Sequence, residues 1–189
     1  MRIFHLHSGG VQELGALPTQ APAQGYVWLA CTRAEFEAQQ AAIQATLLAL
    51  GGATLVDLHI SDLLNAQLTS HYEPTSQYDL LVFRRLATCQ GDGATGEPSQ
   101  PLRKRSGPPV LRRIDTTPVG FAVFDQVLLT VHPADCAARD AYAARLLAAT
   151  PTPEGAEARP ANARLPASPA DLMLRVVNQI VDGYLALRR

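Results

Sequence analysis

The sequence contains no long apolar run and none of the common catalytic signatures. A membrane span needs about 20 consecutive apolar residues, and no run approaches that length. The glycine-rich phosphate loop, the GxSxG nucleophile motif, the HExxH zinc motif and the dinucleotide-binding fingerprint are also missing. The N-terminal segment has one arginine and a very short apolar run, so we do not expect a secretory signal. Nothing here indicates an enzyme.

The sequence also has few cysteines and almost no net charge. Cys31, Cys89 and Cys136 are far apart and include no CxxC pair, so we expect reduced thiols in a cytoplasmic protein. The formal net charge is −1, which gives no general reason to expect a nucleic-acid partner. Because 47% of the 189 residues are hydrophobic, the chain can form one globular domain with a sizeable core.

Two neighbouring apolar runs predict a buried β-hairpin at the centre of a sheet. Residues 119–124 and 127–131 are rich in Val, Phe and Leu without polar alternation, which is typical of strands covered on both faces. They are joined at Asp125 and Gln126. Because glutamine adopts positive φ poorly, a two-residue turn and a longer loop both stay open.

Short apolar segments predict further strands, and polar segments predict connections. Strands are expected at residues 2–7, 26–31, 78–88 and 110–115. Residues 8–24 and 71–77 have the composition of loops. Residues 90–109 are dense in Gly, Pro, Ser and Gln and predict a flexible loop. The basic cluster at 102–105 is more typical of a solvated loop than of a binding site for phosphate or lipid head groups.

Start and stop signals mark the first two predicted helices. Thr32 followed by Glu35 is a capping-box pattern for a helix over residues 32–50, which the Gly-Gly pair at 51–52 ends. Residues 53–70 fit either a strand or a helix. We favour a helix over about residues 58–68, with Asp57 as its cap.

Two helices are predicted in the last third of the chain. Residues 134–150 are rich in alanine, and residues 170–189 follow a Ser168 cap and Pro169. The last helix has an apolar seam spaced 4, 3, 4, 3, formed by Met173, Val177, Ile180, Tyr184 and Leu187. The seam fits a coiled coil or an ordinary amphipathic helix. Because no stop signal follows, we expect a longer helix that continues beyond this chain.

The order of elements predicts an α/β (α+β) fold. It runs strand, strand, helix, helix, strand, strand, hairpin, helix, helix, which indicates a mixed sheet with helices on both faces. We expect an α/β domain over residues 1–169, with a flexible loop at about 90–109. Residues 170–189 would then begin a long stalk helix.

Few side chains suggest a binding site. His5 and His7 lie two apart on one face of a predicted strand and could chelate a metal, although such pairs often arise by chance. His59, His71 and His132 are scattered and are best interpreted as structural. Asp62, beside Ser61, offers hard oxygen ligands of the kind that Mg²⁺ prefers.

Several segments, taken in order, resemble one known family. ISDLLN at residues 60–65, then a proline-containing link and the strand YDLLVFRRL, look like the cytoplasmic domain of the CorA/ZntB divalent-cation transporters. The hairpin VGFAVFDQVLLTVHP resembles the paired strands of that domain. The helix LMLRVVNQIVDGYLALRR resembles the segment leading into the family's stalk. The order of these matches is stronger evidence than any single motif.

The resemblance implies a soluble N-terminal portion of a funnel-shaped homopentamer at the cytoplasmic face of the inner (plasma) membrane. Two membrane spans and the family's Gly-Met-Asn signature are absent from this sequence. It further implies regulatory Mg²⁺ at subunit interfaces, with Asp62 and Asp182 at acidic family positions. Ser61 and Asn178 stand where some members have acids, which weakens a Mg²⁺ cluster. Mg²⁺ is the only cofactor expected, with Zn²⁺ or Co²⁺ as further possible cargo.

Two other functions stay open. A soluble cytoplasmic α/β enzyme would use the His5 and His7 pair or a pocket at a strand end. A coiled-coil adaptor would use its last helix to bind a partner. Neither reading identifies a catalytic residue.

Overall fold

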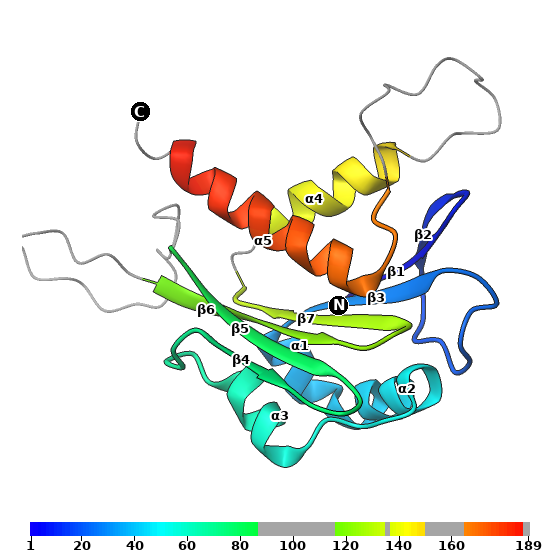
Figure 1. Cartoon of the computed structure of the whole chain (residues 1–189), viewed down its shortest axis with the longest axis horizontal. Coiled ribbons are helices and arrows are strands. Elements are labelled where there is room, and N and C mark those ends of the chain that lie inside the picture. Colours follow the sequence, from blue (N-terminus) through cyan, green and yellow to red (C-terminus); the bar gives the residue numbers. More distant parts are fainter. Residues whose placement is uncertain (87–115, 135–136, 150–164, 187–189) are drawn as a thin grey trace, which may run out of the picture.

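A seven-stranded mixed sheet forms the middle layer of the protein (Figure 1). The computed structural model describes residues 1–86, 116–134, 137–149 and 165–186, with the side chains of the last four left out. The strands are β1 (Arg2–His7), β2 (Gly10–Leu14), β3 (Tyr26–Thr32), β4 (His71–Pro74), β5 (Asp79–Leu86), β6 (Thr116–Val123) and β7 (Val127–His132). They lie in the order β2-β1-β3-β7-β6-β5-β4. Among these described strands, β3 and β7 alone pair in parallel.

Helices cover both faces of the sheet, as the sequence predicts (Figure 1). One face carries α1 (Arg33–Ala38), α2 (Gln40–Gly51) and α3 (Asp57–Leu64). The other carries α4 (Ala137–Ala148) and α5 (Pro169–Ala186). Each helical layer buries its own hydrophobic cluster against the sheet. Among the described residues, no helix has the length and apolarity that a membrane crossing requires.

The predicted central hairpin is confirmed. Every residue of β7 is buried, and β6 pairs with it antiparallel. The backbone N–H of Phe124 donates to the carbonyl of Val127 at 2.9 Å, so only Asp125 and Gln126 lie in the turn. Neither turn residue has a positive φ, so the poor fit of glutamine to such angles is no obstacle.

Two segments predicted as loops contain edge strands. Residues 10–14 form β2 beside β1, and residues 71–74 form β4 beside β5. Both strands are short edge strands, and more than half of the residues in each are polar, glycine or proline. Their composition therefore matches that of a connection. The predicted strand at 110–115 and the loop at 90–109 lie outside the described residues.

The first helical region is confirmed at both ends but is divided in the middle. Thr32 and Glu35 form the predicted capping box, and Gly52 ends α2 with a φ of 75°. At Gln39 the backbone leaves helical geometry, with φ −115° and ψ 19°. The chain therefore turns between α1 and α2, which the continuous helical pattern did not indicate.

The helix at Asp62 is confirmed but shorter than predicted. It runs over Asp57–Leu64, and Val56 occupies the N-cap position without a side-chain cap. Asp57 is thus the first helical residue, where its carboxylate faces the positive end of the helix dipole. The prediction of Asp57 as the cap was wrong by one residue.

Helix α5 starts as predicted, but its buried side differs from the predicted seam. The hydroxyl of Ser168 accepts from the backbone N–H of Asp171 at 3.2 Å, which confirms the cap. Leu172, Val176 and Ile180 are buried, at a spacing of four. Met173 and Val177 are half-buried at the border, and the side chains of Tyr184 and Leu187 lie outside the described residues. The helix therefore packs on the sheet through a face next to the expected one.

A buried polar chain crosses the two central strands. The indole N–H of Trp28 donates to the hydroxyl oxygen of Thr130 at 2.9 Å, and Nε2 of His132 lies 2.8 Å from that oxygen. His132 is fully buried. Burial lowers the pKa of His132 well below 6.5, and the charges of Arg139, Arg85 and Arg33 lower it further. The folded protein therefore keeps this imidazole neutral.

The depressed pKa predicts a loss of stability in mild acid. The unfolded chain takes up a proton at His132 below its ordinary pKa of 6.5, whereas the folded chain does not. The free energy of unfolding is therefore unaffected by this group above that pH. As the pH decreases below it, the free energy of unfolding falls by up to about 1.4 kcal/mol per pH unit. Urea unfolding between about pH 8 and pH 5 measures this slope. The variant His132→Gln should have a shallower slope, whereas the control His5→Gln should keep it. Equal slopes in wild type and His132→Gln would contradict the assignment.

Candidate metal site on helix α3

Asp62 lies on the side of α3 that faces the edge strand β4. Its helix packs on the sheet through His59, Ile60 and Leu63, which are buried. The Asp62 side chain is only 17% exposed, and its Oδ2 lies 3.8 Å from Nε2 of His71 on β4. Of the two predicted site residues, Asp62 is therefore enclosed by the fold and faces a histidine that the sequence analysis treated as structural.

A glycine on the sheet sets how closely α3 approaches. A Cβ atom on Gly120 of β6 would lie 2.2 Å from Cδ2 of Leu63, well inside van der Waals contact. Leu63 is 2% exposed, so it has little space into which it can move. A Cβ at this position would therefore require the Leu63 side chain, on the helix that carries Asp62, to shift.

A second histidine–carboxylate pair joins the same helix and strand. His59, 2% exposed, has Nδ1 2.8 Å from the hydroxyl of Tyr78, which also accepts from the N–H of Val56 at 3.2 Å. Nε2 of His59 lies 3.3 Å from Oε1 of Glu73 on β4. The two pairs run in opposite senses, because α3 supplies a histidine to one and an aspartate to the other. Both ring nitrogens of His59 have partners, which confirms its structural role.

Asp182, the other predicted metal residue, lies elsewhere. It is exposed on α5, across the sheet from α3. One copy of the chain therefore does not bring Asp62 and Asp182 together (Figure 1). Within the described ranges, no group of three or more His, Cys, Asp or Glu side chains could hold a metal ion. A role for either aspartate in metal binding stays a prediction.

The His5 and His7 rings are close, but local hydrogen bonds occupy them. Their centroids are 5.1 Å apart. Nε2 of His5 donates to the carbonyl of Gln24 at 2.8 Å, and Nδ1 of His7 accepts from the N–H of Gly9 at 3.1 Å. A metal on either nitrogen of His7 would break the bond from Gly9, because binding at Nε2 moves the ring proton to Nδ1. The pair is therefore a poor chelate.

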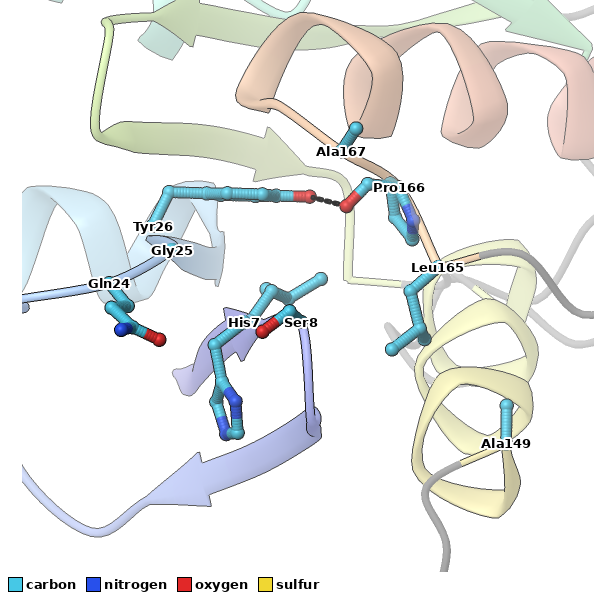
Figure 2. Close-up of a pocket in the computed structure, with 10 residues that line it drawn as sticks. His7, Ser8, Gln24, Gly25, Tyr26, Ala149, Leu165, Pro166 and Ala167 are labelled. Carbon is cyan, nitrogen blue, oxygen red and sulfur yellow. Dashed lines mark hydrogen bonds between the residues drawn. The ribbon is translucent and has the colours of Figure 1, made fainter.

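A pocket of about 480 Å³ lies next to this pair (Figure 2). Tyr26 borders it and donates its hydroxyl hydrogen to the carbonyl of Pro166 at 3.1 Å. Figure 2 shows the His7 ring pointing away from that hydrogen bond. The polar side chains lining the pocket are His7, Ser8, Gln24 and Tyr26. Burial raises the pKa of Tyr26, so its hydroxyl stays protonated and acts as a structural donor.

The thiol of Cys31, the one cysteine within the described ranges, is chemically inert. Cys31 is fully buried in β3, and burial raises its pKa to about 12. A thiol with such a pKa carries almost no thiolate at neutral pH, so it neither attacks substrates nor ligates metals readily. Cys31 is a free thiol, as expected from the sequence, and behaves as a small apolar residue of the core. Cys89 and Cys136 lie outside the described residues.

The close approach of α3 gives a test of how Asp62 is positioned. Gly120→Ala should lower the free energy of unfolding by about 1–3 kcal/mol, because Leu63 and α3 must move away from β6. Chemical denaturation measures the loss. Gly15→Ala is the control, since a Cβ there meets no atom within 4 Å. Equal stability of Gly120→Ala and wild type would contradict the prediction and show that the end of the Leu63 side chain moves aside without cost.

Comparisons with known proteins identify the fold. No family model and no curated protein sequence matches the chain. Solved structures do match it, and the three named below do so over 99% of its length. The full-length CmaX protein has 14% identity and a TM-score of 0.63. The ZntB cytoplasmic domain from Vibrio parahaemolyticus RIMD 2210633 has 13% identity and a TM-score of 0.58. The CorA magnesium transporter from Methanocaldococcus jannaschii has 14% identity and a TM-score of 0.59.

These matches confirm the predicted α/β fold, and the resemblance to CorA/ZntB cytoplasmic domains holds at the level of fold. At such identity a structural match shows a shared fold and carries no residue roles. The chain spans 46% of CmaX and of the complete CorA structure, and 61% of the ZntB domain. It therefore corresponds to less than two thirds of each neighbour.

Proposed function

We propose that the chain is the cytoplasmic regulatory domain of a CorA-like transporter for divalent metal cations, with Mg²⁺ as the first candidate and Zn²⁺ or Co²⁺ as others. The observation that carries the proposal is the fold, which matches a ZntB cytoplasmic domain and a magnesium transporter along 99% of the chain. In this proposal the chain belongs to a homopentamer at the inner membrane, anchored through spans outside this sequence.

The placement of the two aspartates supports a role in subunit assembly. Asp62 and Asp182 lie on helices that cover opposite faces of the sheet. A cation shared between such positions must therefore join two subunits. Carboxylates from neighbouring copies would hold the ion and keep the subunits together, and loss of the ion would let the carboxylates repel one another. Metal-dependent gating follows from that change in subunit contact.

The two alternative functions have less support in the structure. The His5 and His7 rings are engaged in backbone hydrogen bonds, which weakens an enzyme built on them. The buried side of α5 packs on the sheet, which leaves less of its apolar surface for a coiled-coil partner. Of the large apolar side chains of α5 up to residue 182, Leu174 and Val181 are exposed, at 54% and 40%.

The gene gives the first test of the transporter proposal. The reading frame beyond codon 189 should encode two apolar runs of about 20 residues, with Gly-Met-Asn at the end of the first. Sequencing the frame checks this directly. A stop codon at or just after Arg189 would remove the transporter reading and return the chain to the class of self-contained α/β proteins.

Thermal melting tests cation sensing by the domain. A bound divalent ion at ten times its Kd should stabilise the fold by about 1.4 kcal/mol, which raises Tm by about 3–6 °C. Asp62→Ala should reduce the shift produced by Mg²⁺, Zn²⁺ or Co²⁺. Asp57→Ala is the matched control, because it removes an exposed carboxylate from the same helix. A wild-type Tm that is indifferent to all three ions would contradict metal sensing.

A further inference from the structure

The ring orientation of His71 is fixed by its backbone. Nδ1 of His71 lies 3.1 Å from the carbonyl oxygen of Thr69. A carbonyl oxygen only accepts hydrogen bonds, so Nδ1 must carry the hydrogen. A neutral imidazole has a single N–H, and therefore Nε2 of neutral His71 presents a lone pair.

That lone pair faces another acceptor. Nε2 of His71 is 3.8 Å from Oδ2 of Asp62, beyond the length of a direct hydrogen bond. An ionised carboxylate has lone pairs and no hydrogen to donate. Two facing acceptors need a group between them that donates hydrogen or carries positive charge. That group is a proton on His71, which makes an ion pair, a bridging water, or a bound cation.

The geometry matches the surroundings of a metal-bound histidine. Such histidines almost always donate the other ring N–H to a carboxylate, a backbone carbonyl or water, as His71 does to Thr69. Zinc–nitrogen and zinc–oxygen bonds of about 2.0–2.2 Å at a tetrahedral angle place the two ligand atoms about 3.3–3.5 Å apart. A small rotation of the Asp62 carboxylate closes the difference, because both side chains are partly exposed.

The neighbouring pair does not compete for the same ion. Both ring nitrogens of His59 have partners, at Tyr78 and Glu73. No third His, Cys, Asp or Glu of the described chain joins Asp62 and His71 around one point. Water, or a side chain from a second copy, would complete the coordination. This is an open site that one nitrogen and one oxygen ligand define.

We propose that Asp62 and His71 of one chain together bind a divalent transition-metal ion, with Zn²⁺ as the first candidate, in preference to Mg²⁺. Imidazole nitrogen suits zinc, nickel and copper, whereas Mg²⁺ takes oxygen ligands almost exclusively. The inference rests on the proposed function for its biological meaning. It deepens that function by naming the class of cation that Asp62 senses and the residue that selects it.

The test is a titration of the full chain with Zn²⁺. Calorimetry measures the affinity, and the ring-nitrogen NMR signals of the histidines report which of them binds the ion. Zn²⁺ should shift the NMR signal of Nε2 of His71, whereas Mg²⁺ at the same concentration should not. Asp62→Asn and His71→Asn should each weaken Zn²⁺ binding by at least about tenfold, or 1.4 kcal/mol. In the His71→Asn variant the side-chain amide can still donate to the carbonyl of Thr69, so the backbone geometry is kept while the ligand nitrogen is lost.

Two control variants exclude other sites. Asp57→Asn removes an exposed carboxylate from the same helix and should leave Zn²⁺ affinity unchanged. The double variant His5→Gln/His7→Gln removes the other histidine pair and should also bind Zn²⁺ as wild type does. Circular dichroism and melting of every variant confirm that each one is folded.

Specific outcomes would overturn the inference. Zn²⁺ affinity that survives Asp62→Asn and His71→Asn, or that vanishes with the His5 and His7 variant, would place the ion elsewhere. No Zn²⁺ binding, with His71 protonated beside Asp62, would leave an ion pair only. Mg²⁺ binding that depends on Asp62 but not on His71 would overturn the inference and leave the proposed function standing. Zn²⁺ binding by a chain whose frame stops at codon 189 would support the inference and contradict the transporter.

Discussion

The parallel pairing of β3 with β7 is the contact on which the rest of the structure depends. The two strands run in register from Val27 opposite Val127 to Thr32 opposite His132, and they join the N-terminal and C-terminal parts of the sheet. Both are buried on both faces, so each helical layer packs directly on them. Parallel strands need a crossover between them, and the described part of that interval contains three helices and three other strands.

The candidate metal site lies where this packing ends. Helix α3 rests on β6 through Leu63 and Gly120, and its remaining polar side faces the short edge strand β4. A central position would bury carboxylates and imidazoles without solvent, at a high cost in free energy. At the edge, Asp62 and His71 stay partly exposed, so an ion can enter and water can complete its coordination.

Low identity to the structural neighbours is compatible with a shared fold. A TM-score of 0.63 at 14% identity means that the backbone fold is shared while most side chains differ. A buried strand accepts many apolar residues, provided that volume and alternation are maintained. A metal site accepts few residue types. Ser61 and Asn178 stand where the resemblance leads one to expect acids, so site residues must be argued from this chain's own geometry.

The sequence by itself determined the features that depend on local chemistry. The buried hairpin, the capping box at Thr32, the glycine stop at Gly52 and the Ser168 start of α5 all follow from short segments. Tertiary structure alone decided the edge strands β2 and β4, the division at Gln39 and the buried side of α5. It also separated Asp62 from Asp182 and placed His71 opposite Asp62. These features depend on contacts between residues distant in sequence, and no local pattern of apolar and polar residues encodes which strand an edge segment will join.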